Sequence, residues 1–331
     1  MRRPPQIPLA QPALPRAAPS RTHVAIVLGT LGGARFLPAQ LESLLAQSHR
    51  DWSLWAHDDG SEDGTWEILR AFAAEAGARG HAVHLHRRQS AGGVAASYHW
   101  LLSRPELREA PHIAFCDQDD VWRPDRLARG IAALAHAPRD LPILASSAMA
   151  LIDGEGRPLG LTRPRRGAPP PAPGLAACLA QCPTNAPTLL MNGAARDLAV
   201  SLPLPHPLPS LDWWLVALVL GTGGRILHDP TCTVSYRQHG GNSLGEAGTW
   251  RGTGRRLALL RDGTYRRWRD ALVAGLARAP LTPEAARAVA AYRAAPAAGL
   301  ARHRALQSAG ISRRGRASGL ISLLGALTGR L

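Results

Sequence analysis

The chain has 331 residues, 45% of them hydrophobic, which is enough for one large α/β domain with an appendage and an ordinary buried core. Its 39 basic residues, all arginine, exceed its 24 acidic residues and give a net charge of +15, which favours anionic partners such as phosphates or an acidic membrane surface. A nucleic-acid-binding protein is not favoured, because no such motif is present and the few aromatic residues are not interleaved with arginine for base stacking.

Short apolar runs alternate with segments of helical periodicity from Val24 onward, which indicates βαβ units around a mostly parallel sheet. In the first part of the chain we expect strands over 24–28, 52–56, 82–86 and 113–116, separated by helices over 36–45, 66–76 and 94–103. Beyond them the pattern predicts helices over 126–136, 193–202 and 211–220, strands over 143–152, 188–191 and 225–236, and a Pro-, Arg- and Gly-rich loop over 157–174. The predicted fold class is therefore α/β, with a mixed, mostly parallel sheet flanked by helices.

Three regions are expected along the chain. Residues 1–21 form a Pro- and Arg-rich tail that lacks the apolar core of a signal peptide, 22–247 form the main domain, and 248–331 form a C-terminal helical region. The four cysteines match neither a zinc pattern nor a disulfide framework, which favours a reducing cytosol. No apolar run reaches the roughly 18 to 20 residues that span a bilayer.

The stretch HIAFCDQDDVWRPDR places Asp117, Asp119 and Asp120 within four positions, directly after the apolar run Ile113–Cys116. The carboxyl ends of strands form the edge at which open α/β sheets bind ligands. Carboxylates crowded there repel one another unless a cation joins them, and a hard divalent cation that holds a diphosphate is the usual partner. The alternative is an acidic turn in which an aspartate caps the next helix.

A second acidic strand end follows the strand predicted over 52–56, in the sequence DDGSEDGT. A carboxylate such as Asp59 can accept from a base imide or a ribose hydroxyl there, although a plain turn and helix cap has the same composition. The loop Gly29–Gly33 has neither the lysine of a P-loop nor a complete dinucleotide fingerprint, so its own signal is weak. Together these segments are expected to line one crevice.

Two further motifs lie later in the chain. In LDWWL, Asp212 precedes two tryptophans at the start of an apolar helix, where it is either a general base that faces the crevice or a helix cap. In YRQHGGN, residues 236–242, His239 is a candidate metal ligand or phosphate contact, and Arg237 can pair with a diphosphate. Both are equally compatible with surface positions on a turn.

In this order, the motifs resemble those of the family 2 glycosyltransferases, which have the Rossmann-like GT-A fold, and most closely those of rhamnosyltransferase-type bacterial members. The resemblance covers about residues 22–245. It is carried by LESLLAQSHRDW (41–52), DDGSEDGT (58–65), AFCDQDDVWRPDRL (114–127), DWWL (212–215) and YRQHGGN (236–242). The chain departs from the family where a TYNG-like sequence usually follows the first strand and where a histidine usually precedes the aspartate of DWW.

The resemblance implies a role for each matching position. Asp59, with Thr30 nearby, would hold the nucleoside, and Asp120 would position the donor sugar. Asp117 and Asp119 would form the DXD-type site for Mg2+ or Mn2+ on the donor diphosphate. Asp212 would be the general base. His239 would complete the metal or diphosphate site, and Arg237 would contact the diphosphate.

The function implied is an inverting, metal-dependent transfer of a sugar, with rhamnose as the leading suggestion, from a nucleotide-sugar donor to a saccharide or lipid-linked acceptor in cell-surface polysaccharide synthesis. A non-catalytic member that binds a sugar nucleotide, and a nucleotidyltransferase on a related fold, are the alternatives. The protein is expected in the cytoplasm. Peripheral contact with the inner face of the plasma membrane is expected through 312–331, where arginines precede an apolar stretch, unless that stretch is a packing helix.

Overall fold

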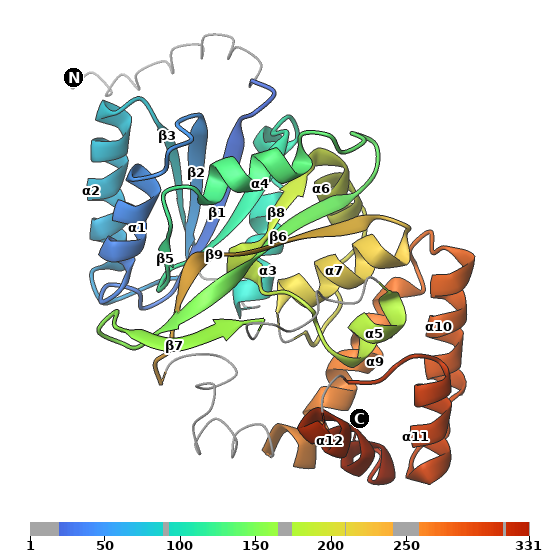
Figure 1. Cartoon of the computed structure of the whole chain (residues 1–331). Coiled ribbons are helices and arrows are strands. Elements are labelled where there is room, and N and C mark those ends of the chain that lie inside the picture. The colour runs from blue at the N-terminus through green and yellow to red at the C-terminus, as the bar shows by residue number, and fades with distance from the viewer. Residues whose placement is uncertain are drawn as a thin grey trace, which may run out of the picture.

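The computed structural model describes residues 20–88, 93–164, 174–208, 210–240, 258–313 and 316–330 (Figure 1). Nearly all of the predicted N-terminal tail lies outside these residues. The predicted domain boundary at 247/248 and the end of the YRQHGGN motif also lie outside them.

The centre of the molecule is a mixed sheet whose nine strands run in the order β3-β2-β1-β4-β8-β6-β9-β5, with β7 paired to β6. The strands are β1 (Val24–Thr30), β2 (Trp52–Asp58), β3 (Ala82–Arg87), β4 (His112–Asp117), β5 (Val121–Trp122), β6 (Ile143–Ile152), β7 (Pro158–Arg163), β8 (Leu190–Asn192) and β9 (Arg225–Arg237). Pairing is parallel across β3-β2-β1-β4 and between β6 and β9, and antiparallel elsewhere. The mixed α/β fold class predicted from the sequence is confirmed.

Strand β1 is buried on both faces, as expected of a continuous apolar run inside a parallel sheet. Ala25 and Val27 belong to one hydrophobic core, and Val24, Ile26 and Leu28 belong to another on the opposite face. Helices α3 (Gly93–Leu102), α6 (Gly193–Val200) and α7 (Leu211–Gly221) contribute to the first core. The second core is completed by α1 (Leu37–Leu45), α2 (Thr65–Ala78) and α4 (Arg126–Leu134).

Helix α7 is buried along its whole length, which confirms the interpretation of its apolar sequence as an internal helix. It lies between the sheet and the C-terminal helices α9 (Thr264–Leu276), α10 (Pro283–Ala294), α11 (Gly299–Ser308) and α12 (Arg316–Leu327), with the short α5 (Leu175–Ala180) beside them (Figure 1). The all-helical character predicted for the end of the chain holds wherever residues beyond 258 are described. Within the described residues, none of the helices combines the length and the apolarity that crossing a membrane requires.

Two strands were not predicted. The segment expected as a loop over 157–174 begins with β7, which pairs with β6. Its leucines, Leu159 and Leu161, are 43% and 52% exposed, so the strand buries no apolar face that would mark it in the sequence. Strand β5 has only two residues and is defined by its pairing with β9, a contact across more than a hundred residues that periodicity cannot reveal.

Candidate active site

The carboxyl ends of β1, β2 and β4 meet at one edge of the sheet. In the parallel register Thr30 lies opposite Asp58, and Gly29 lies opposite Asp117. The structure therefore brings the two predicted acidic strand ends and the loop after β1 to the edge where open α/β sheets bind ligands.

Thr30 and Asp59, the predicted nucleoside contacts, are neighbours at this edge. Asp59 is half-buried, and its backbone N–H donates to Thr30 O (2.9 Å). The buried Thr30 hydroxyl donates to Asp58 Oδ1 (3.0 Å). Asp58 is fully buried, accepts from the Ser61 N–H (3.1 Å) and lies 3.4 Å from Arg87 Nε. Asp58 thus builds the turn, and Asp59 is the more exposed carboxylate of the pair.

The loop after β1 is held in place by Gln118. Its side-chain amide accepts from the Leu31 N–H (2.9 Å) and donates to Leu31 O (3.0 Å). Gly33 donates its N–H to Thr65 Oγ1 (2.8 Å), and a Cβ at this glycine would collide with Gln118 Oε1. The loop that carries the aspartates therefore also shapes the loop at the nucleoside end of the site.

Asp117 ends β4 and begins the acidic loop, which we define as Asp117–Asp120. Tyr98 from α3 donates its hydroxyl to Asp117 Oδ1 (2.7 Å). Burial, and after it the charge of Asp119, raises the pKa of Asp117 to about 7. Asp212 raises this pKa as well, so the two carboxylates lie close enough to repel each other.

Asp119 and His239, two of the predicted metal ligands, are in direct contact although 120 positions separate them. His239 Nε2 lies 2.7 Å from Asp119 Oδ2, and the two side chains are 21% and 19% exposed. The ring of Phe36, 4.7 Å away between centroids, packs against the imidazole. Both side chains are thus held at the sheet edge with part of their surface open.

Asp120 and Arg237 fix the acidic loop to the end of β9. Asp120 is fully buried and accepts the Arg237 N–H at Oδ1 (3.0 Å), while Oδ2 has no hydrogen-bond partner among the described residues. Burial, and next the charge of Asp119, raises the pKa of Asp120 well above its usual value. The Arg237 guanidinium donates to Asp119 O (2.8 Å) and Gly154 O (3.1 Å). Through these contacts Arg237 positions the acidic loop, in addition to the diphosphate contact that is predicted for it.

Asp212, the predicted general base, lies in the first turn of α7 and is 5% exposed. Its Oδ2 accepts from the Ala186 N–H (3.0 Å) and its Oδ1 from the Trp213 N–H (2.8 Å). Burial raises the pKa of Asp212 despite these hydrogen bonds. The carboxylate accepts a hydrogen bond within the first turn of α7, but it is not the helix cap, because the N-cap residue is Ser210; its charge also raises the pKa of Asp117.

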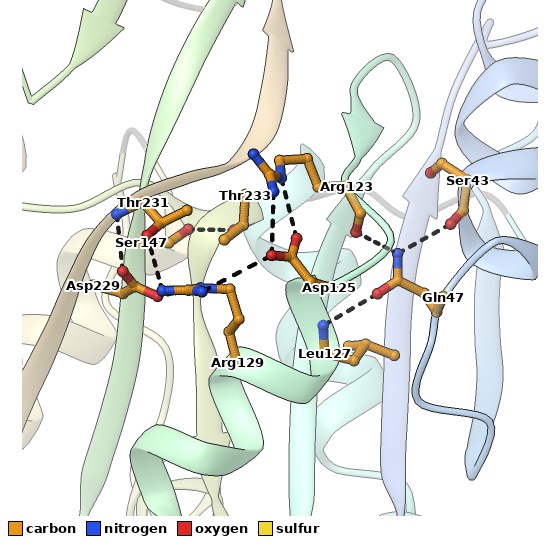
Figure 2. A network of polar contacts seen from close by, with 10 residues as sticks. All are labelled: Ser43, Gln47, Arg123, Asp125, Leu127, Arg129, Ser147, Asp229, Thr231 and Thr233. Atoms are coloured by element: carbon orange, nitrogen blue, oxygen red, sulfur yellow. Dashed lines mark hydrogen bonds and ion pairs between the residues drawn. The ribbon is translucent and has the colours of Figure 1, made fainter.

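The segment after the acidic loop is anchored on two sides (Figure 2). Gln47, just after α1, donates to Arg123 O (2.8 Å) and accepts from the Leu127 N–H (3.1 Å). On the other side, Arg129 of α4 donates to Asp229 of β9 (2.6 Å). Because these contacts join three elements, they fix the position at which the chain leaves the acidic loop.

The residues of the acidic loop fit a cation in chemical terms. Among the described residues, no set of three or more His, Cys, Asp and Glu side chains already forms a metal site. However, a cation would relieve the burial and the repulsion by Asp119 that raise the pKa of Asp117, and it could bind the buried Oδ2 of Asp120, which has no hydrogen-bond partner among the described residues. Asp117, Asp119 and His239 are the groups available to hold it, with phosphate oxygens of a donor as further ligands.

Three residues important to this geometry were not singled out from the sequence. Tyr98 is a lone tyrosine in an apolar helix, and Gln118 stands between aspartates that drew attention away from it. Arg126 is buried under Trp122 and donates to Pro187 O (3.1 Å), and its charge lowers the pKa of Asp117. An arginine in the first turn of a helix, where acids are favoured, is a signal that was available.

The comparisons with known proteins agree with this geometry. The sequence model of Glycosyl transferase family 2 matches residues 26–149. The putative glycosyltransferase EpsE of Bacillus subtilis (strain 168) is 33% identical over 115 residues, which cover 35% of this chain and 39% of EpsE. The dTDP-rhamnosyl transferase RfbG of Shigella flexneri is 22% identical over 246 residues, which cover 72% of this chain and 81% of RfbG.

A solved structure shares the fold. The mannosyltransferase PcManGT from Pyrobaculum calidifontis, in complex with GDP-Man and Mn2+, superposes with a TM-score of 0.51 at 16% identity, covering 93% of this chain and 85% of that one. The mixed sheet with flanking helices is thus that of the GT-A glycosyltransferases. The family model matches the part of the chain that contains the acidic loop, so residues 26–149 are similar to glycosyl transferase family 2.

Proposed function

We propose that the chain is an inverting glycosyltransferase that moves a sugar from a nucleotide-diphosphate donor to a saccharide or lipid-linked acceptor in cell-surface polysaccharide synthesis. The observation that carries this proposal is the contact of His239 with Asp119 of the acidic loop, across 120 positions of the chain; the charge of Asp212 also raises the pKa of Asp117. The match of residues 26–149 to the model of glycosyl transferase family 2 supports it.

The donor would lie along the sheet edge. Asp59 and Thr30 would hold the nucleoside, and Asp117, Asp119 and His239 would hold Mg2+ or Mn2+. When bound, this metal ion neutralises the charge of the donor diphosphate and makes it a better leaving group. Beyond the metal site, Asp120 would contact the donor sugar, and Arg237 would contact the diphosphate.

Asp212 would act as the general base. It takes the proton of the acceptor hydroxyl while that oxygen bonds to the anomeric carbon, and the bond from this carbon to the diphosphate oxygen breaks on the opposite face. A single displacement of this kind inverts the anomeric centre. Its raised pKa suits the role, because a buried carboxylate is a stronger base than one in water.

A donor screen tests the proposal directly. The full chain is incubated with dTDP-rhamnose, GDP-mannose and a series of UDP-sugars, in Mn2+, in Mg2+ and in EDTA, and the released nucleoside diphosphate is measured. The likeness to RfbG puts dTDP-rhamnose first, and the complex of PcManGT with GDP-Man and Mn2+ supports GDP-mannose as the second arm. We expect release from one donor, suppressed by EDTA. Binding without release from any donor would support the non-catalytic alternative, and release unaffected by EDTA would remove the metal from the proposal.

Peripheral membrane contact through 312–331 is part of the proposal. Helix α12 packs against α11 and buries Ala326, yet Leu324 and Leu327 are 47% and 39% exposed. Replacing both leucines by serine leaves the packed face intact, so the fold should be retained. We expect the double variant to co-sediment less with anionic vesicles than the unmodified chain does, and equal co-sedimentation would contradict membrane contact by this helix.

A further inference from the structure

A cavity of about 40 Å³ lies among the C-terminal helices and shares no lining residue with the candidate active site. Its wall is formed by α9, α11, α12, the end of α5 and the segment before α12, which gather on one side of the molecule (Figure 1). The polar side chains that line it are Arg269, His303, Gln307, Ser312, Arg313 and Ser322. Gln307 and Ser312 are exposed, so the cavity is reached from the surface.

Among the described residues that line this wall, none is a carboxylate. Residues 285–331 contain eight arginines and no Asp or Glu. The nearest acid to the wall in sequence is Asp270, whose Oδ1 accepts from the Tyr292 hydroxyl (2.7 Å) and whose Oδ2 lies 3.5 Å from Arg266 Nε. The cavity therefore collects positive charge without an internal counter-ion on its wall.

Arg269 is the residue that points to a ligand. It is 3% exposed, and its Nε has no hydrogen-bond partner among the described residues. Burial, and less strongly the charges of Arg313 and Arg302, lowers the pKa of Arg269 to about 10, so the guanidinium remains charged at neutral pH. A buried cation is unfavourable unless an anion and hydrogen bonds compensate it.

The size of the cavity limits what the anion can be. One water needs roughly 10–15 Å³ of such space, so 40 Å³ admits about three waters or one compact tetrahedral anion, and a sugar nucleotide is excluded. Arginine forks bind phosphate oxygens in pairs, and serine hydroxyls add donors. We propose that Arg269 and Arg313 bind a phosphate group here, either free phosphate or the phosphomonoester head group of a lipid.

Calorimetric titration of the full chain with inorganic phosphate, at constant ionic strength set with chloride, tests the first source. Arg313→Gln removes one wall charge, and Arg304→Gln removes the same charge from an exposed position on α11 outside the cavity. We expect phosphate affinity to fall about tenfold or more in Arg313→Gln, the loss of a charge-assisted hydrogen bond, and to stay within about twofold in Arg304→Gln.

Vesicles test the second source. Phosphatidic acid presents a phosphomonoester and phosphatidylglycerol a diester, so the two are compared at equal surface charge. A preference for phosphatidic acid that Arg313→Gln loses and Arg304→Gln keeps would assign the site to a lipid. Binding of inorganic phosphate without that preference would assign it to free phosphate.

The proposal is overturned if the unmodified chain neither binds inorganic phosphate nor prefers phosphatidic acid. An equal loss of binding in Arg313→Gln and Arg304→Gln would overturn it as well, because the effect would then be one of net charge alone. Arg269→Gln is a further variant, checked first for its circular dichroism spectrum. If that variant does not fold, Arg313→Gln decides the result, since Arg313 is only half-buried.

Discussion

The candidate active site and the cavity among the C-terminal helices both gather buried charge, but of opposite sign. At the sheet edge, three aspartates stand within four positions and Asp212 lies nearby. Among the C-terminal helices, Arg269 and Arg313 line a wall without any carboxylate. The ligands proposed for the two regions are accordingly of opposite charge: a cation with its diphosphate at the first, and a phosphate group at the second.

Arginines in both regions also donate hydrogen bonds to backbone carbonyls. Near the acidic loop, Arg126 and Arg237 donate to backbone carbonyls rather than to the carboxylates. Among the C-terminal helices, Arg313 donates to Ala180 O (3.2 Å) and Arg302 to Pro296 O (2.9 Å). These four guanidinium groups therefore hold neighbouring segments of backbone together, whatever else they bind.

The largest effect is expected from Asp212→Asn. Loss of the general base should lower kcat by about 10²- to 10⁴-fold, while the dissociation constant of the donor identified in the screen stays within about threefold. Stopped assays and calorimetry on the same preparation measure the two quantities. Glu284→Gln, a change of the same kind at an exposed position on α10, serves as the control.

The pH dependence of kcat is a second test of the role of Asp212. Because burial raises the pKa of Asp212, the acidic limb of kcat in the unmodified chain should lie above the ordinary aspartate value of 3.8. Activity should fall as the pH drops through that limb, since the protonated carboxyl cannot accept a proton. A donor affinity lost together with kcat in Asp212→Asn would count against the base assignment.

Asp119→Asn tests whether the active site and the cavity among the C-terminal helices bind their ligands independently. We expect Mn2+-dependent donor binding to weaken by about 100-fold or more, because a metal-bound carboxylate contributes several kcal/mol of charge stabilisation. Stabilisation of the fold by phosphate should be unchanged in this variant. Arg313→Gln should show the reverse pattern, and melting temperatures with Mn2+ plus nucleotide, or with phosphate, measure both. If either variant lost both stabilisations, the two regions would not be independent.

Tyr98→Phe sharpens the description of the acidic site. The hydroxyl that donates to Asp117 Oδ1 is removed while the ring stays in the core, so we expect the metal affinity to fall about 10-fold. The free energy of unfolding should fall by only about 1 kcal/mol. A metal titration in the presence of donor, together with urea unfolding, separates the two. An unchanged metal affinity would show that Tyr98 serves packing alone.

An effect on stability, rather than on ligand binding or catalysis, is expected from Gly33→Ala. The new methyl group displaces the flexible end of Gln118, and loss of its two hydrogen bonds to Leu31 should cost about 1–2 kcal/mol of stability. Gln118→Ala removes the obstacle, so the double variant should be no less stable than Gln118→Ala alone. Chemical unfolding of the four proteins forms a double-mutant cycle. Additive losses would mean that the two residues do not interact.

Strand β1 could be predicted because both of its faces are buried, so that it is an almost continuous apolar run followed by turn residues. Strand β7 could not, since its leucines face solvent and leave no pattern. The contact between Asp119 and His239 was anticipated only through the resemblance of the motifs, because spacing carries no information across 120 residues. Tyr98 was out of reach, since a single tyrosine in an apolar helix looks like ordinary core.

The bridge from Gln118 to Leu31 gives the two ends of a donor a common support. The loop for the nucleoside and the loop for the diphosphate are ordered by the same side chain, so ordering either one reduces the conformational entropy lost by the other. A nucleoside and a metal-bound phosphate joined in one molecule then gain from effective concentration as well as from their separate contacts. A donor bound as proposed would therefore be held more tightly when intact than its fragments would be, by more than the sum of those contacts.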